Sequence, residues 1–155
     1  MKPLQIYQKV KYLESYDIYE LYRNRGIVIV HNPDLFVNST KIARIISDIF
    51  GNTTVFLRMR SGEYPMYENY ILWHELGHIE TYGLALAPES YDARTKNNQR
   101  EIECNMFAFF GMFYTNRRLI NSAGSKYLGM PEDDLEKVIT TLSQDEEFMR
   151  YLNVK

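Results

Sequence analysis

The chain has 155 residues, a length that suits one domain, and we expect residues 1–155 to form a single folding unit. Its net charge of −2 gives no electrostatic reason to expect direct nucleic-acid binding, and no apolar run approaches the roughly 20 residues of a membrane span. The single cysteine excludes an intrachain disulfide framework, and the first residues lack the apolar core of a signal peptide, so we expect a cytoplasmic protein.

The chain before residue 35 predicts one helix and one strand. Residues 15–25 form an amphipathic pattern, with Ser15 as a cap at the start and Gly26 as the stop. The run Ile-Val-Ile-Val at 27–30 predicts a short buried strand. Asn-Pro-Asp at 32–34 predicts a turn after it.

A second helix and a second strand are predicted before the long helices begin. Isoleucines spaced three and four apart form an apolar stripe that predicts a helix over residues 40–50, with Gly51 at its end. The stripe consists of Ile42, Ile45, Ile46 and Ile49. Partial alternation predicts a strand over 53–60, followed by a turn at 61–63.

The remainder of the chain predicts four helices separated by polar or glycine-containing loops. The helices cover residues 65–82, 98–118 and 131–141, and a capping-box pattern at 143–146 opens the last one. The predicted loops are 84–97 and 121–129. We therefore expect an α+β fold that is mainly helical. A small antiparallel sheet of two or three strands would pack on the helix over 65–82 and on the second long central helix.

Residues 74–78 read His-Glu-Leu-Gly-His, an HExxH motif. A helix turns by about 100° per residue, so His74 and His78 lie within about 40° of each other and can bind one metal ion. Glu75 flanks this face, close enough to act on a water at the metal but not placed as a third ligand. These groups suit zinc-assisted hydrolysis. The alternative is a helix that carries two histidines and a glutamate by chance.

A third metal ligand is expected from the next long helix, which has two acidic candidates. Glu101 and Glu103 are about 200° apart on a helix, so they cannot both face the metal. Glu101 shares its face with small or amide side chains, whereas Glu103 shares its face with aromatic ones. The small-residue face consists of Cys104, Asn105, Ala108 and Gly111. We therefore choose Glu101 as the ligand and leave Glu103 as a surface carboxylate or an ion-pair partner of Arg100 or Arg117.

Three further residues bear on this site. Gly77 costs a helix interior about 1 kcal/mol relative to alanine, so it should allow close approach of another element or make room for substrate. Asn105 is placed to bond the outer nitrogen of a ligand histidine. His31, the only other histidine, is a weaker candidate ligand.

The two motifs together resemble the ImmA/IrrE family of zinc metallopeptidases. HELGH is followed by Glu-Ile-Glu-Cys-Asn-Met-Phe-Ala at 101–108, where the family reads roughly E-x-E-A-N-x-F-A, and the resemblance covers most of residues 15–115. It implies a zincin-like, gluzincin-like enzyme with His74 and His78 as Zn²⁺ ligands, Glu75 as catalytic base and a second-motif glutamate as third ligand. Cys104 replaces the usual alanine.

The resemblance implies a function as well as a site. Stand-alone members of the family resemble proteins whose genes lie beside those of phage-type or mobile-element repressors. Those proteins cleave the neighbouring repressor. We therefore expect a zinc endopeptidase that acts on a protein partner of this kind, with Tyr70, Tyr82 or Tyr91 as oxyanion-stabilising candidates. Two alternatives remain open: a non-catalytic metal-binding module that sequesters a repressor, and a hydrolase of small peptides or amides.

Overall fold

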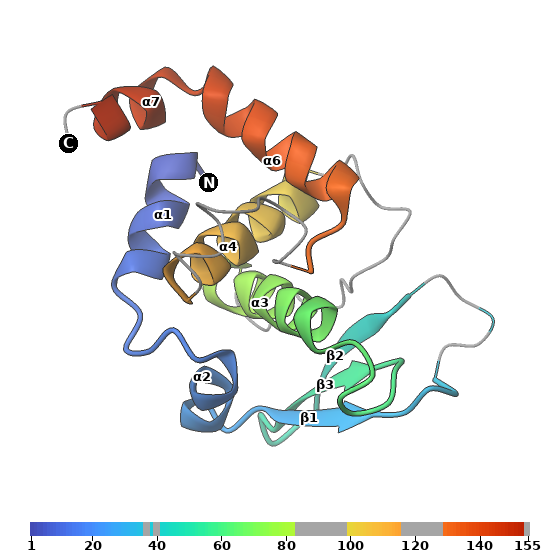
Figure 1. Cartoon of the computed structure of the whole chain (residues 1–155). Helices are drawn as coiled ribbons and strands as arrows, with labels where there is room; N and C mark the ends of the chain where they lie inside the picture. Colours follow the sequence, from blue (N-terminus) through green and yellow to red (C-terminus); the bar gives the residue numbers. More distant parts are fainter. Residues whose placement is uncertain (36–37, 39–40, 83–98, 116–128, 154–155) are drawn as a thin grey trace.

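The computed structural model describes residues 1–35, 38, 41–82, 99–115 and 129–153, and these form a mixed α+β fold. Six helices are described: α1 (Pro3–Lys11), α2 (Ile18–Asn24), α3 (Pro65–Tyr82), α4 (Gln99–Thr115), α6 (Glu132–Gln144) and α7 (Glu146–Asn153) (Figure 1). The strands are β1 (Val28–His31), β2 (Ala43–Ser47) and β3 (Thr53–Leu57). Within the described ranges, no helix has the length and apolar character needed to cross a membrane.

The three strands form a mixed sheet with the order β1-β3-β2. β2 and β3 are antiparallel, with Ile45 opposite Val55, whereas β1 runs parallel to β3, with Val28 opposite Thr54. The expectation of a purely antiparallel sheet is therefore wrong. The short turn between β2 and β3 makes these two strands antiparallel, and β1 pairs with the other edge of β3. Parallel strands need a long connection, and here the connection from β1 to β3 includes β2.

The helix predicted over residues 40–50 is also wrong, because this segment contains β2. Ala43 and Ile45 point into the core, whereas Ile46 and Ile49 are 45% and 93% exposed. The isoleucine stripe is thus not a buried face. β-branched side chains lose rotamer freedom in a helix and pack well on a pleated surface, so pairing with β3 outweighs the helical spacing.

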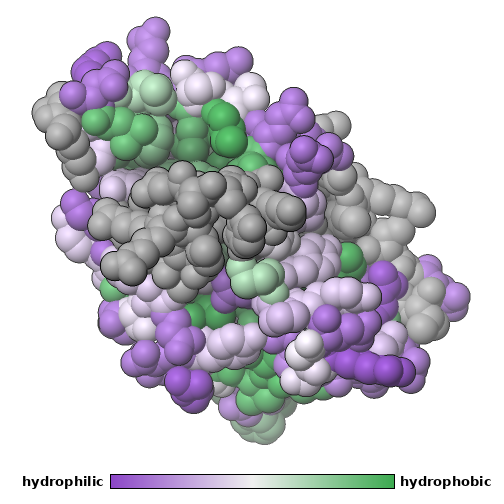
Figure 2. Space-filling view, in the orientation of Figure 1, coloured by the Kyte–Doolittle hydropathy of each residue, from purple (hydrophilic) through white to green (hydrophobic). Residues whose placement is uncertain are grey.

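A hydrogen-bonded turn joins β2 to β3. The Asp48 carboxylate accepts the backbone N–H groups of Phe50 and Asn52, each at 2.9 Å. Gly51 has φ of +82°, a conformation that glycine adopts without steric cost, so it serves this turn and does not end a helix. The turn leaves Ile49 and Phe50 93% and 82% exposed. On the face drawn in Figure 2, hydrophobic residues also gather at the lower end of the molecule, where Figure 1 places the sheet.

Helix α1 was not predicted from the sequence. Pro3 occupies its first turn, and its buried face, which includes Ile6 and Val10, belongs to the core. α1 packs against α4, so its burial depends on a helix far away along the chain. In Figure 1 it lies beside α4 and close to α7.

Two helix starts differ from the predicted caps. Asp17, not Ser15, caps α2, because its carboxylate accepts the N–H groups of Tyr19 and Glu20. Asp145, not Ser143, caps α7, with a 2.8 Å bond from the N–H of Phe148. In both cases an aspartate two residues further along caps the helix in place of a serine; both residue types are favoured at a helix start, so residue preference alone did not choose between them.

Other predicted elements lie close to the observed ones. The end of α2 at Gly26, where φ is +66°, is confirmed, as is the bond of Asn32 to the N–H of Asp34 in the predicted turn. The strand over 53–60 ends at Leu57, and α6 extends three residues beyond 141. The predicted loops at 84–97 and 121–128 lie outside the described residues.

Helices α3 and α4 pack side by side at the centre of the molecule (Figure 1). A methyl group at Gly77 would lie 3.1 Å from the Cβ of Phe107 and 3.3 Å from the Cα of Cys104. A methyl group at Gly111 would overlap the indole ring of Trp73. The close approach expected at Gly77 is thus confirmed, and a second glycine on α4 serves the same contact.

Candidate metal centre

Helices α3 and α4 bring His74, His78 and Glu101 together. All three side chains are buried, and one potential ligand atom of each lies within 4.8 Å of the others. Nε2 of His74 is 2.8 Å from one carboxylate oxygen of Glu101, and Nε2 of His78 is 3.1 Å from the other. These three residues were predicted as ligands from helical spacing and from the small-residue face of α4.

Local structure explains why these groups converge. His74 and His78 are about one turn apart in the middle of α3, which runs without interruption from Pro65 to Tyr82. Glu101 stands in the first turn of α4. Because Gly77 lets α4 approach within van der Waals contact of α3, a glutamate side chain from α4 is long enough to reach both imidazoles.

The electrostatics of the group centre on Glu101. Burial by itself raises the pKa of its carboxyl, but the neighbouring imidazoles of His74 and His78 outweigh this and hold the pKa at about 2. Glu101 is therefore ionised at neutral pH. A buried negative charge faces two imidazole nitrogens, which is a donor set suited to a divalent cation.

One buried nitrogen supports the fit of a metal ion to these residues. Nε2 of His78 makes no hydrogen bond to any described residue, although Oε1 of Glu101 lies at an ion-pair distance of 3.1 Å. A buried polar atom without a hydrogen bond is costly unless something else satisfies it. A cation held between His78 and Glu101 would satisfy this nitrogen, so the residues present fit such an ion.

Glu75 is buried on the same helix but is not a member of the ligand group. Burial and then the negative charge of Glu75 raise the pKa of Tyr22, so this carboxylate lies near the α2 side of α3. Glu75 is thus not one of the three clustered residues, and its role as a catalytic base stays a prediction.

Glu103 lies on another face of α4 and has different partners. Its carboxylate accepts a 2.6 Å hydrogen bond from the hydroxyl of Tyr82 and pairs with the N-terminal ammonium of Met1. The predicted partner Arg100 instead lies over the ring of Tyr82, 4.4 Å from its centroid, and Arg117 is outside the described residues. The structure therefore brings Glu101, and not Glu103, to the histidines.

Asn105 contacts His74 at the ring nitrogen that does not face Glu101. Its side-chain oxygen is 2.6 Å from Nδ1 of His74, which agrees with the role predicted for it. The same oxygen accepts a 2.6 Å bond from the hydroxyl of Tyr70, whose own oxygen lies 3.1 Å from Oδ2 of Asp134. Sequence reasoning missed Asp134, because no local pattern places this residue of α6 against α3.

His31 lies outside the histidine–glutamate cluster. Its Nε2 is 2.7 Å from one oxygen of the buried Glu68 carboxylate, and the other oxygen accepts a 2.5 Å bond from Tyr19. Burial, then the hydrogen bond to Glu68 and the Glu68 charge, raise the pKa of Tyr19. These contacts join α2, β1 and the start of α3, which is a structural role.

The three tyrosines named as oxyanion candidates differ in their surroundings. Tyr70 is buried and bonded to Asn105, and Tyr82 donates to Glu103. Tyr91 lies outside the described residues.

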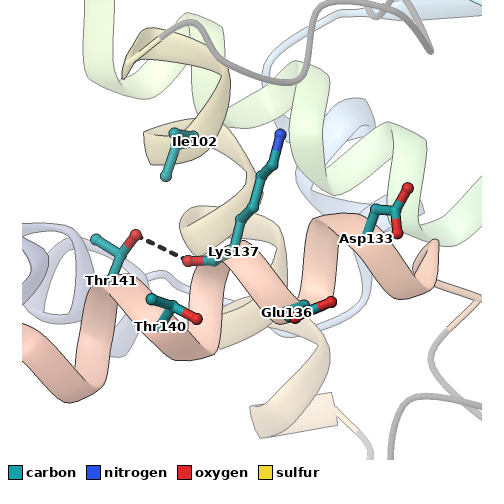
Figure 3. A pocket seen from close by; sticks show the side chains of 6 residues that line it. All are labelled: Ile102, Asp133, Glu136, Lys137, Thr140 and Thr141. Atoms are coloured by element: carbon teal, nitrogen blue, oxygen red, sulfur yellow. Dashed lines mark hydrogen bonds between the residues drawn. The ribbon is translucent and has the colours of Figure 1, made fainter.

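A surface groove of about 440 Å³ runs between α4 and α6 (Figure 3). It is lined by Ile102, Asp133, Glu136, Lys137, Thr140 and Thr141. Figure 3 shows Lys137 extending away from α6, while its backbone carbonyl accepts a 2.8 Å bond from the Thr141 hydroxyl. None of these residues belongs to the histidine–glutamate cluster, so the groove and the candidate metal centre are different places.

Comparison of the chain with models of known protein families, with curated proteins and with solved structures found no match. The resemblance to ImmA/IrrE peptidases therefore rests on the residues of the two motifs alone.

Proposed function

We propose that this protein is a zinc-dependent endopeptidase with a zincin-like fold that hydrolyses peptide bonds in a protein partner. One observation carries the proposal: His74 and His78 of α3 and Glu101 of α4 meet in a buried cluster, and Glu75, the residue after His74 on the same helix, is buried as well. Two histidines, a more distant glutamate and a further carboxylate are the residue set of HExxH hydrolases.

Each of the four residues has a distinct role in this proposal. His74, His78 and Glu101 hold the ion, and a set of three protein ligands is typical of catalytic zinc sites, whereas structural sites use four. Bound zinc supplies Lewis acidity towards a peptide carbonyl and makes water more acidic. Glu75 takes a proton from the water as its oxygen bonds to the peptide carbon, and then gives that proton to the amide nitrogen, so that the C–N bond breaks and the amine leaves.

The proposed substrate is a phage-type or mobile-element transcriptional repressor. The support for this choice is the resemblance of residues 74–78 and 101–108 to ImmA/IrrE motifs. A net charge of −2 favours a protein partner over direct binding to nucleic acid.

The test uses the purified protein, zinc and the repressor encoded nearest to its gene. Substoichiometric wild-type protein should cleave the repressor over repeated turnovers, and Glu75→Gln should bind zinc and remain folded but lose cleavage by at least about a hundredfold. Glu80→Gln is the matched control, because it removes a carboxylate from the same helix outside the cluster and should retain activity.

Three outcomes would count against the proposal. Cleavage by Glu75→Gln at the wild-type rate would show that the catalytic assignment is wrong. Stoichiometric binding of the repressor without cleavage would favour the sequestering module. Short peptides cleaved as fast as the protein would favour a small-peptide hydrolase.

A further inference from the structure

We propose that the outer face of the sheet binds the same face of a second copy of this chain. The strand register sets two rows of side chains on this face: Val28, Thr54 and Ile46 in the first row, and Val30, Phe56 and Arg44 in the second. The alternate residues of the strands, which include Ile45 and Val55, are buried on the other face, and α3 lies on that side of the sheet (Figure 1).

The outer face is more apolar than a sheet surface in water usually is. A sheet with one face in solvent normally carries polar side chains there, whereas four of these six are apolar. Val28 and Ile46 are 56% and 45% exposed, so the chain itself leaves them open. The turn after β2 extends the patch, because Ile49 and Phe50 are largely exposed. An exposed apolar patch of this kind marks an interaction surface.

Charges at the two ends of the patch select its occupant. Arg44 stands at one end and has no ion-pair partner among the described residues, whereas Asp48 stands at the other end, beside the exposed turn. Hydrogen bonds from Asn52 hold the pKa of Asp48 below its usual value, so this carboxylate is ionised at neutral pH. A patch with a positive and a negative end is complementary to itself. An anionic membrane, or a partner of one charge sign, would meet a like charge at one end.

A two-fold axis that crosses the strands at the level of Ile46 matches these ends. Ile46 lies midway between Arg44 and Asp48 along the chain, so the rotation brings Arg44 of one copy to Asp48 of the other. The same rotation lays the turn of each copy, with Phe50, over the second row of the other copy, which contains Phe56. Strands stacked in the same direction would instead set Arg44 against Arg44, which costs free energy. The strands of the two copies therefore stack in opposite directions.

The area of the patch implies a weak dimer. β2 and β3 have five residues each. Three strands about 4.8 Å apart, with a rise of about 3.3 Å per residue, present a face of roughly 14 by 16 Å. Even with the turn added, this is small compared with the ~800 Å² that each partner buries in a standard interface. Monomers should therefore dominate at low concentration, and dimers should form at roughly tens to hundreds of micromolar.

Sedimentation equilibrium of the full chain, from about 1 μM to about 1 mM, measures this association. The mass of the wild-type protein should rise from 18.4 kDa towards twice that value. Phe50→Ser should weaken association by at least about tenfold, because it removes the larger of the two exposed apolar side chains at the turn. Ile139→Ser is the matched control: it removes an exposed apolar side chain from α6 and should leave association unchanged.

A double-mutant cycle tests the orientation of the two copies. Arg44→Glu sets like charges together at both ends of the interface and should raise the Kd by about tenfold, since two exposed ion pairs are lost. Asp48→Asn keeps an acceptor for the turn but removes its charge, so adding it to Arg44→Glu should recover part of the lost affinity. Within one chain these residues lie about 13 Å apart along the strand, beyond the Debye length at physiological salt, so their coupling would arise across the interface. Arg150→Glu, an exposed site on α7, controls for reversal of an arginine charge.

Wild-type protein that stays at 18.4 kDa up to the highest concentration would overturn the inference. If this monomer bound vesicles of anionic lipid and Phe50→Ser did not, the outer face would be a membrane-binding surface instead. Association of Phe50→Ser as tight as that of the wild type would place the contact elsewhere, and additive effects of Arg44→Glu and Asp48→Asn would exclude the opposed stacking. None of these results bears on zinc binding or peptide cleavage, which test the proposed function.

Discussion

At the scale of single residues, Glu101 gives the site a defined pH dependence. Its pKa is lowered from 4.5 to about 2 in the folded protein. A lowered folded-state pKa stabilises the protein above the unfolded value, and the stabilisation is lost as the pH falls from about 4.5 towards 2. At about 1.4 kcal/mol per pKa unit, the effect at neutral pH is on the order of 3 kcal/mol.

The corresponding variant is Glu101→Gln, studied by urea denaturation of metal-free protein between pH 6 and pH 3. It should be less stable than wild type at pH 6, and the difference should shrink as the pH falls. Glu63→Gln, which removes an exposed carboxylate, is the control for loss of a glutamate elsewhere in the chain. A difference between wild type and Glu101→Gln that stays constant down to pH 3 would contradict the lowered pKa.

Residue contacts within or between the two motif helices could be predicted from the sequence, but more remote ones could not. The rotation of 100° per residue is enough to place His74 beside His78, and the small-residue face of α4 is enough to favour Glu101 over Glu103. The contact of Asp134 with Tyr70 depends on how α6 packs, which no local spacing encodes. Tyr70 was accordingly considered as an oxyanion donor, whereas the structure places its hydroxyl against Asn105.

At the scale of secondary-structure elements, prediction succeeded where burial and periodicity agree. The bounds of α3 were predicted because Pro65 starts the helix and the segment is long enough to exclude a strand. The segment at 40–50 failed because its isoleucine spacing matches a helix although the strand partner β3 decides its conformation. Helix α1 was not predicted because its apolar side chains are buried by contact with α4, which lies far away along the chain.

The packing of α3 on α4 depends on the missing side chain of Gly111. Gly111→Ala would place a methyl group against the indole ring of Trp73, which is fully buried. We expect it to reduce the free energy of unfolding by about 3 kcal/mol, near the upper end for overpacking, and to weaken zinc binding because the two ligand-bearing helices are pushed apart. Urea denaturation and chelator competition measure the two effects.

A double-mutant cycle with Trp73→Leu isolates this contact. The smaller side chain makes room at Gly111, so Gly111→Ala should cost much less in the Trp73→Leu background than in wild type. Additive effects of the two substitutions would show that the close approach is not what requires glycine at this position.

At the scale of the whole molecule, the candidate metal centre takes its ligands from α3 and α4, which are separate segments of the chain. An ion bound there would link the two helices, so metal binding should stabilise the fold. Any ion that binds only the folded state adds RT ln(1 + [L]/Kd) to the free energy of unfolding, which is about 2.7 kcal/mol when free zinc is a hundred times Kd. Thermal and urea denaturation with zinc, and after its removal by a chelator, should show this gain in the wild-type protein. His78→Ala should abolish it, because the remaining His74 and Glu101 cannot complete the ligand set. His31→Ala controls for loss of a histidine elsewhere, since its ring is bonded to Glu68 and not to the site. Equal stabilisation of the wild type and His78→Ala by zinc would place the ion outside the α3–α4 contact and would remove the physical basis for the proposed peptidase.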